Sequence, residues 1–569
     1  MTSTRSSALC LGLAVAAATM FAATPLSAGT GSVKSHTKIS GDEGGLNAVV
    51  TLDGGDRFGW AVGSMPDFDG NGVDDLLVGV KDDDDGGFGR GAVYIVTLDT
   101  DGSVLGADKI SNTSGGLSAS LQNGDWFGWS VCSLGDLDGD GTGDIAVGAL
   151  NDSGSGFVAG AVYILFLNAN GTVKAEQKIS TNAGGFVGFL ADFAGFGCSV
   201  ANLGDLDGDG VTDLAVGSFG DTSGYYRGAL YILFMNTDGT VKAQQKINDL
   251  EGGLNAVLED GDEFGWACAP LGDLDGDGNE DVAVSAILDD DGNSDAGTVY
   301  VLFLNADGTV KSHTLIGSEL GGLVAVIDQA DHFGRGVANV GDLNGDGVND
   351  LAVGSVWDGD GAEKAGAVFV LFMDSSGLVI AEQKISAVAG NFTGTLDAGD
   401  TFGNSVAPLG DINGDGILDL AVGADHDDDA VGDGGAVYVL FLDETSLNSV
   451  GNALAGTYGN PILDGIGTFD VGQVVGVSLS NALENVNAWF VLSTGFLNLP
   501  FKGGVMVPDI ATGLAFTLPT GPSGDSATLG GVWPAGVPSG VPLVFQCWIP
   551  DAAGPVGFAA SNAVAGTTP

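Results

Sequence analysis

Asp136-Leu-Asp-Gly-Asp-Gly-Thr-Gly-Asp144 is one of six closely similar strings in this chain, and their spacing indicates its architecture. Each string follows the pattern D-x-[DN]-G-[DN]-G-x-x-D, and successive copies lie 69, 69, 68, 69 and 69 residues apart. Self-similarity at a fixed period is typical of repeat proteins, in which each repeat is one supersecondary unit. The six strings begin at Asp67, Asp136, Asp205, Asp273, Asp342 and Asp411.

Each string lies within a unit of four predicted β-strands. A Phe-Gly pair such as Phe127-Gly128 precedes it, and short apolar runs such as residues 145–149 and 161–167 follow it. β-branched and aromatic residues fill these runs, and Gly, Asp and Asn separate them. The last run, residues 171–179, mixes Lys, Glu and Gln as an exposed edge strand does. Four antiparallel strands with a polar outer edge, repeated radially, predict an all-β propeller blade.

The two ends of the repeat array predict how the ring closes. The sixth unit stops after its third strand at Leu442, whereas residues 31–39 match a fourth strand such as residues 310–314. We therefore expect the N-terminal strand to complete the last of six blades. Seven blades are the alternative, with the seventh contributed by the C-terminal region.

Composition restricts the class of partner and the cellular location. The chain has 74 acidic and 17 basic residues, a formal net charge of −57. This charge excludes nucleic acid as a partner, since such binding needs a basic footprint. Residues 1–28 combine Arg5, an Ala-rich apolar run and small residues at the end, as a signal peptide does. No later stretch is long and apolar enough for a transmembrane segment, so we expect a secreted or cell-surface protein.

The acidic strings predict a calcium site in every blade. Side-chain oxygens at the first, third, fifth and ninth positions, with the carbonyl of the seventh, can surround one hard cation. A ligand set without His or Cys favours calcium over zinc or copper. An EF-hand is excluded because Val stands at the twelfth position, where that loop needs Glu. About six Ca²⁺ ions per chain would then be held by Asp67, Asp69, Asn71 and Asp75; Asp136, Asp138, Asp140 and Asp144; Asp205, Asp207, Asp209 and Asp213; Asp273, Asp275, Asp277 and Asp281; Asp342, Asn344, Asp346 and Asp350; and Asp411, Asn413, Asp415 and Asp419.

The combination of Phe-Gly, acidic string and following strand resembles the FG-GAP repeat of the integrin alpha-chain N-terminal β-propeller. The resemblance covers residues 31–445. It implies that the residues just named bind calcium at one rim and that a protein or glycan ligand binds at the opposite rim. Two features depart from the family: integrin propellers have seven blades, of which only some bind calcium, and the GAP triplet is degenerate here, as at Val78-Gly-Val80.

The remaining features carry weaker predictions. Residues 451–569 lack the repeat and have short β-like runs, which favours a small β-sandwich-like C-terminal domain. We expect Trp60, Trp129 and Trp266, which follow Phe-Gly pairs, to lie in the core near the propeller axis. The acidic runs at residues 82–85, 289–291 and 425–429 are interpreted as a solvated rim.

These observations favour a secreted, calcium-binding module for cell-surface or extracellular binding and adhesion, with structural calcium and no enzymatic activity. The chain has four His residues and neither a G-x-S-x-G string nor a P-loop. Two alternatives stay open, because propellers also host enzymes. One is an extracellular hydrolase or other propeller enzyme, and the other is a purely structural matrix protein.

Overall fold

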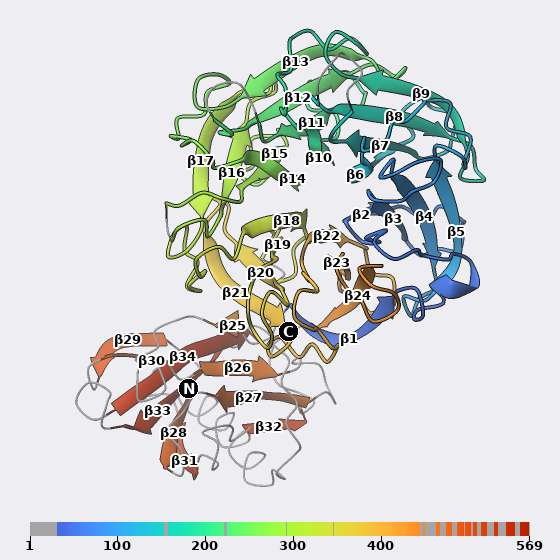
Figure 1. Ribbon diagram of the computed structural model, residues 1–569. Helices are drawn as coiled ribbons and strands as arrows, with labels where there is room; N and C mark the ends of the chain where they lie inside the picture. Colours follow the sequence, from blue (N-terminus) through green and yellow to red (C-terminus); the bar gives the residue numbers. More distant parts are fainter. Residues whose placement is uncertain are drawn as a thin grey trace. The chain divides into compact units, whose positions relative to one another are not determined.

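The computed structural model describes residues 31–152, 158–220, 225–291, 293–344 and 346–443, together with the strands of the C-terminal region and a few residues beside them. Among these residues the chain is all β, apart from one 3-10 turn, η1 (Leu46–Ala48). Six four-stranded sheets surround a central axis (Figure 1). The six-bladed propeller is therefore confirmed over the seven-bladed alternative. The predicted signal peptide, residues 1–28, lies outside the described residues.

Five blades consist of four consecutive strands, each running from the innermost strand to the outermost. Neighbouring strands within these blades are antiparallel, as in β7 with β8. The strands are β2 (Ala61–Met65), β3 (Asp75–Val80), β4 (Ala92–Leu98) and β5 (Val104–Ser111); β6 (Phe127–Gly135), β7 (Asp144–Ala149), β8 (Ala161–Leu167) and β9 (Val173–Ile179); β10 (Phe196–Asn202), β11 (Leu214–Ser218), β12 (Ala229–Met235) and β13 (Val241–Ile247); β14 (Phe264–Gly272), β15 (Asp281–Ala286), β16 (Thr298–Leu304) and β17 (Val310–Ile316); and β18 (Phe333–Asn339), β19 (Leu351–Ser355), β20 (Ala367–Met373) and β21 (Val379–Ser386).

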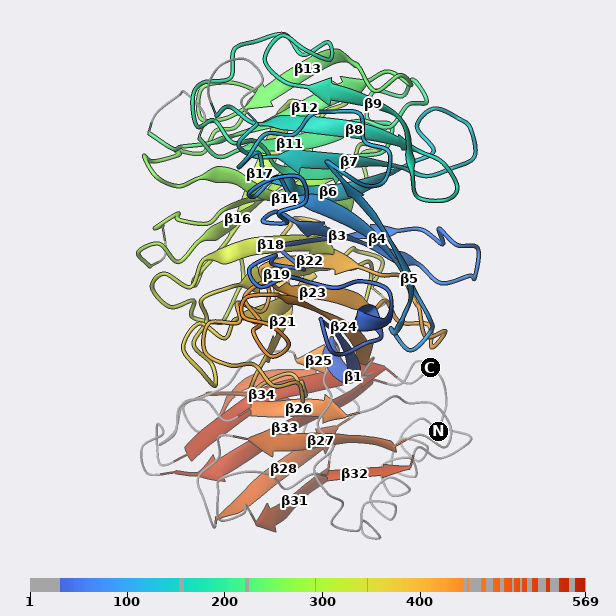
Figure 2. The same cartoon turned by 45° about the vertical axis from the view of Figure 1, so that its right-hand side comes forward.

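The sixth blade joins the two ends of the propeller sequence, as predicted. Its strands are β22 (Ser405–Pro408), β23 (Leu420–Ala424), β24 (Ala436–Asp443) and, outermost, β1 (Ser32–Ile39). Figures 1 and 2 both show β1 beside β24. Blade 6 and blade 1 are joined by the same kind of backbone hydrogen bond that joins the other neighbouring blades. Here the Phe58 N–H donates to the Gly434 carbonyl at 2.8 Å. The ring is thus closed by hydrogen bonds rather than by chain continuity.

The Phe-Gly pairs form the seams between blades. All six Phe side chains are fully buried. In the seam between blades 1 and 2, the Phe127 N–H donates to the Arg90 carbonyl at 3.0 Å. Gly128 there has a φ of 88°, and a Cβ on it would lie 2.3 Å from the Ala92 carbonyl oxygen. Only glycine fits such a close backbone approach, which explains the pair physically.

The C-terminal strands belong to a second compact unit, whereas residues 35–442 form the first. They form sheets in the orders β25-β34-β33-β28-β31, β26-β27-β32 and β29-β30, so this region is β-rich as predicted. The predicted boundaries at residues 445 and 451 lie outside the described residues, and the sandwich arrangement stays a prediction. The strands are β25 (Asn448–Ser449), β26 (Ile462–Ile466), β27 (Val474–Ser480), β28 (Asn487–Ser493), β29 (Phe496–Phe501), β30 (Gly504–Pro508), β31 (Leu514–Pro519), β32 (Leu529–Val532), β33 (Pro542–Pro550) and β34 (Phe558–Thr567).

Candidate metal centre

The six acidic loops each join the first strand of a blade to the second. In blade 2, β6 ends at Gly135 and β7 begins at Asp144, so the string lies between them. The Phe-Gly pairs stand near the start of the first strands, at their other end. All six loops therefore share one rim, called here the metal-loop rim. The loops between second and third strands, and the connections from each fourth strand to the next blade, form the opposite rim.

The ninth residue of each string is fully buried and ties its loop to the third strand. Asp144 accepts the Leu137 N–H on one carboxylate oxygen and the Leu167 N–H on the other, each at 3.0 Å. A carboxylate oxygen has a second lone pair, so these bonds leave room for a cation. The same pair of backbone bonds recurs in all six loops, at Asp75, Asp144, Asp213, Asp281, Asp350 and Asp419.

The first residue of the string fixes the turn. The two oxygens of Asp136 accept the N–H groups of Asp140 and Gly141, each at 2.8 Å. Asp140 in turn accepts the Thr142 N–H at 2.9 Å. Short side chains that accept backbone N–H groups two to five residues ahead wrap the chain around them. The loop therefore directs its carboxylates toward one point.

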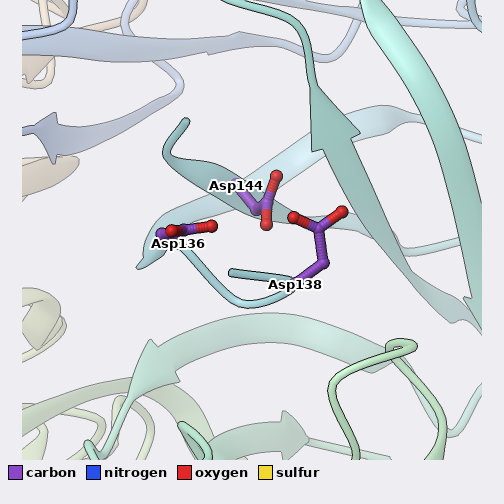
Figure 3. Close-up of side chains that lie close together, drawn as sticks. All are labelled: Asp136, Asp138 and Asp144. Carbon is purple, nitrogen blue, oxygen red and sulfur yellow. The ribbon is translucent and has the colours of Figure 1, made fainter. Parts of the chain in front are cut away.

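Three loops bring carboxylates from the first, third and ninth positions together. In blade 2 the ligand atoms of Asp136, Asp138 and Asp144 all lie within 4.8 Å of one another, and the side chains point toward a common space (Figure 3). Blades 3 and 4 repeat this arrangement. The three groups are Asp136, Asp138 and Asp144; Asp205, Asp207 and Asp213; and Asp273, Asp275 and Asp281.

The other three loops do not form such a carboxylate group in the part of the chain that the structure describes. Each has an Asn at the third or fifth position. Asn413 donates its amide to both oxygens of Asp419, at 3.5 and 3.3 Å. Asn71 donates to the Leu98 carbonyl at 2.8 Å, and Asn344 accepts the Asp346 N–H at 2.9 Å. The predicted ligands Asp67, Asp69, Asp342, Asp346, Asp411 and Asp415 lie in these loops, where they stay predictions.

Crowding and burial disfavour the charged form of the ninth residue. Burial, with Asp207 nearby, raises the pKa of Asp213 to about 6, and burial raises the pKa of Asp281 to about 6 beside Asp275. The same causes raise the pKa of Asp350 to about 7. A bound cation would reverse this effect, because an opposite charge within a few ångströms favours the carboxylate.

Lysines of the fourth strand occupy the carboxylate loops of blades 2, 3 and 4. Lys174 lies 2.8 Å from Asp138 and also pairs with Asp140. Blades 1 and 5 have Leu105 and Ile380 at the corresponding positions. The spacing of the acidic strings predicts the fifth-position residues as ligands but does not predict these lysine partners. The pairs are Lys174 with Asp138 and Asp140, Lys242 with Asp207 and Asp209, and Lys311 with Asp275 and Asp277.

The donor set fits a hard cation such as calcium. All the side-chain donors are carboxylate or amide oxygens, and three loops already hold three carboxylates within coordination range of a common point. Converging carboxylates repel one another, and the single lysine in each of these three loops neutralises only part of their charge, so the loops favour a further cation on electrostatic grounds. Bound calcium would neutralise these carboxylates and add a further link between the first and second strands.

The acidic runs on the opposite rim differ from the solvated rim that was expected. Asp83, Asp289, Asp425 and Asp427 are at most 3% exposed. Asp83 lies 2.5 Å from the ammonium of Lys109 on the neighbouring fourth strand. The interpretation as a solvated rim is therefore wrong for these residues. For Asp83 and Asp427 the missing signal was a lysine of the fourth strand, Lys109 and Lys38 respectively.

The tryptophans that follow the Phe-Gly pairs lie at the axis, as predicted, but they are half-buried rather than core. Trp60, Trp129 and Trp266 line a cavity of about 100 Å³ bounded by the inner strands of all six blades. The guanidinium of Arg335 lies 5.1 Å from the ring centre of Trp60 and 4.4 Å from that of Trp266. The chain's own cation therefore stacks on these rings.

Comparison with known proteins places this fold and site in a class. An FG-GAP repeat model matches residues 127–165, 196–233 and 402–440. Integrin alpha-4 of Xenopus laevis is 31% identical over 173 residues, covering 29% of this chain and 15% of that protein. Integrin alpha-PS5 of Drosophila melanogaster is 36% identical over 165 residues, covering 29% of this chain and 15% of that protein. The propeller therefore contains FG-GAP repeats, and part of the chain is similar to integrin alpha chains.

An enzyme also appears among the similar proteins. Phosphatidylinositol-glycan-specific phospholipase D of Rattus norvegicus is 31% identical over 180 residues, covering 31% of this chain and 20% of that enzyme. Each match thus spans a fifth or less of the relative's length. A solved structure of a rhamnogalacturonan lyase aligns with 75% of this chain and with 80% of its own length, at 13% sequence identity and a TM-score of 0.27. No helix in the described residues is long and apolar enough to cross a membrane.

Proposed function

We propose that this chain is a secreted FG-GAP propeller that binds calcium structurally and acts as an extracellular or cell-surface binding or adhesion module, without turnover. Similarity to integrin alpha chains supports the binding role. The carboxylate groups in the blade loops support the calcium role. Secretion rests on the signal-peptide character of residues 1–28 and is tested by N-terminal sequencing of the exported protein.

Calcium would act here as a staple within each blade. We propose about six ions per chain, one in each acidic loop. The ninth-position aspartates already join the loop to the third strand through backbone bonds, as the Leu167 N–H to Asp144 bond shows. The first- and third-position carboxylates belong to the loop alone. An ion shared by these groups would fix the loop against the second strand.

The partner is proposed to bind at the opposite rim, as a protein or glycan. The observation that carries this proposal is the distribution of exposed large apolar side chains, most of which lie in the connections of that rim. Such side chains on loops of a rigid scaffold are typical of recognition surfaces. They include Phe88, Val187, Phe189, Tyr225, Leu250, Val257, Val324 and Val388, each at least 69% exposed.

Elemental analysis and calorimetry test the calcium role. We expect about six calcium ions per chain after dialysis against a calcium buffer. Excess chelator should lower the melting temperature, and calcium should restore it better than magnesium, because magnesium requires a tighter octahedral shell. One or two ions per chain, or an unchanged melting curve in chelator, would contradict the proposal.

Paired variants test the binding role on immobilised matrix proteins and a glycan array. Trp357 is 37% exposed on the opposite rim, with the Lys364 ammonium 3.8 Å from its ring centre. We expect Trp357→Ala to weaken binding without changing the melting temperature. Asp136→Ala with Asp138→Ala should instead destabilise blade 2 and reduce binding only through that loss. Binding that no rim substitution affects would overturn the assignment.

An enzymatic role is the competing hypothesis. Similarity to phosphatidylinositol-glycan-specific phospholipase D raises it, although the match covers only 20% of that enzyme. The purified chain should show no turnover on a panel of glycosyl phosphoesters and polysaccharides. Turnover that survives repurification and disappears in a folded rim variant would replace the binding proposal with an enzymatic one.

A further inference from the structure

Four blades fill an acidic site on the opposite rim with a lysine of their own. In blade 1 the Lys109 ammonium lies 2.5 Å from Asp83 and 2.8 Å from Asp85. It also lies 5.4 Å from the ring centre of Tyr94 on the third strand. Each of these sites combines an ammonium group, aspartates of the second-to-third strand loop and an aromatic ring. The other three pair Lys178 with Asp152, Lys384 with Asp358 and Asp360, and Lys38 with Asp427 and Asp429.

Blade 4 keeps the acids and the ring but lacks the lysine. Strand pairing sets Tyr300 opposite Leu315, as it sets Tyr94 opposite Lys109 in blade 1. A leucine therefore stands where the other blades place an ammonium group. A cavity of about 290 Å³ opens beside it, lined by Asp289, Tyr300, Leu315 and neighbouring acids.

The cavity has a high density of negative charge. Besides Asp289 it is lined by Glu259, Asp262, Asp290 and Asp291. Burial raises the pKa of Asp262 to about 7, with further contributions from Asp289 and Asp290. None of these five acids takes part in an ion pair among the residues that the structure describes.

The hydrogen bonds of Asp289 show how the base of the cavity is held. One of its oxygens accepts the Tyr300 hydroxyl at 2.8 Å, and the other accepts the Thr298 hydroxyl at 3.1 Å. His313 also lines the cavity, but burial lowers its pKa, so its ring is neutral near pH 7 and supplies no counterion. The carboxylates are thus positioned but not neutralised by the chain.

We propose that this pocket of blade 4 binds an alkylammonium group from outside the chain, in the place that the lysine ammonium takes in blades 1, 2, 5 and 6. The lysine-filled sites of these four blades show which ligand this arrangement of residues accepts, namely a primary ammonium group between aspartates and an aromatic ring. In the four lysine-filled blades the ammonium lies 5.4 to 5.6 Å from the centre of the corresponding aromatic ring, a contact that favours an organic cation over a metal ion. The exposed Asp290 and Asp291 give access from the rim. The proposal is independent of the calcium loops and of the identity of the adhesion partner.

Thermal shift with n-butylammonium chloride tests the pocket, against sodium chloride at equal ionic strength. Leu315→Lys restores the lysine of the other blades, and Leu315→Met is its size-matched control. We expect n-butylammonium to raise the melting temperature of wild type and L315M but not of L315K. Without added n-butylammonium, the melting temperature of L315K should be higher than that of L315M. The dissociation constant for n-butylammonium should be at least about tenfold higher in L315K than in wild type.

A second pair of variants keeps the test independent of how L315K folds. Asp291→Asn should weaken n-butylammonium binding, whereas Asp85→Asn, the same change in lysine-filled blade 1, should not. Nα-acetyl-lysine amide binding more tightly than n-butylammonium would identify the occupant as a lysine side chain of a protein, and equal binding would identify a small free amine. Equal responses of wild type and L315K to n-butylammonium, measured with calcium held at one saturating concentration, would overturn the proposal.

Discussion

The metal loops of blades 2, 3 and 4 differ from those of blades 1 and 5 in two respects that change their electrostatics. The first set has Asp at all four ligand positions and a lysine against the third and fifth carboxylates, as Lys311 is against Asp275 at 2.6 Å. The second set has an Asn at one position, and Leu105 or Ile380, each more than half exposed, in place of the lysine. The same backbone turn therefore exists with and without a cation of its own.

The blades therefore differ in how much the stability of their metal loops depends on cations from solution. A lysine stabilises a loop in the absence of metal but competes with the metal for the same oxygens. A loop without the lysine has no such competitor and no such support. The opposite rim shows the same contrast in other blades, where four acidic sites contain a lysine and that of blade 4 does not.

Removal of calcium with a chelator should have the largest effect on stability. It should also affect the two sets of loops differently. Saturating calcium at about a hundredfold its dissociation constant would contribute about 2.7 kcal/mol per site. In chelator we expect faster amide hydrogen exchange at residues 67–75 and 342–350 than at residues 136–144 and 205–213. Equal exchange in both sets would show that the lysines do not replace the metal.

Removing a ninth-position aspartate should have the next largest effect, whether or not a lysine is present. Asp350→Ala leaves the buried N–H groups of Leu343 and Met373 without an acceptor. We expect a loss of about 3 kcal/mol in the free energy of unfolding, in chelator as well as in calcium. Asp342→Ala, in the exposed part of the same loop, is the control and should cost much less in chelator. Equal losses from the two variants would show that Asp350 acts only through metal.

The pH dependence of stability compares blade 4 with blade 2 on the opposite rim. The folded-state pKa is about 7 for Asp262 and about 6 for Asp125, both above the ordinary value for Asp. The folded state then binds more protons than the unfolded state between about pH 4 and 7, so stability falls as pH rises through this window. Asp262→Asn should remove more of this slope than Asp125→Asn and should stabilise the protein at pH 7.5 by about 1–2 kcal/mol.

The measurement is urea unfolding at pH 5.0, 6.0 and 7.5 in chelator. Burial raises the pKa of Asp125 to about 6, and the nearby Lys178 offsets part of this rise; no lysine in the described part of the chain does so for Asp262, which is the reason for the expected order. Parallel pH profiles for the two variants would show that the absent lysine of blade 4 has no electrostatic consequence.

Exchange of the metal-loop lysine and leucine should have the smallest effect on calcium affinity. It tests directly whether the lysine competes with calcium. Lys174→Leu should modestly tighten calcium binding in blade 2, and Leu105→Lys should weaken it in blade 1. Both side chains are partly exposed, so solvent screening keeps the change small. Calcium titration followed by hydrogen exchange at residues 136–144 and 67–75 measures each loop separately. Shifts in the same direction for both variants would contradict competition.

Local chemistry explains why so much of the fold could be predicted from the sequence. The period of the acidic strings, the Phe-Gly pairs and the strand alternation are all local, and they determine six blades of four strands. The match of residues 31–39 to a fourth strand determined the closure. The acidic loops were predicted as metal sites because their oxygen donors lie within nine residues of one another.

Which charged side chains come into contact depends on how distant segments pack. Whether Lys174 contacts Asp138, and whether Leu315 leaves a cavity beside Asp289, depends on the register of a fourth strand against loops 36 and 26 residues away in the sequence. The burial of Asp83 and the backbone bonds to Asp144 depend on how neighbouring strands pack. A linear pattern shows that carboxylates are present, but their partners and exposure follow from pairing between distant segments, and this pairing decides which acidic sites are neutral and which still need a cation.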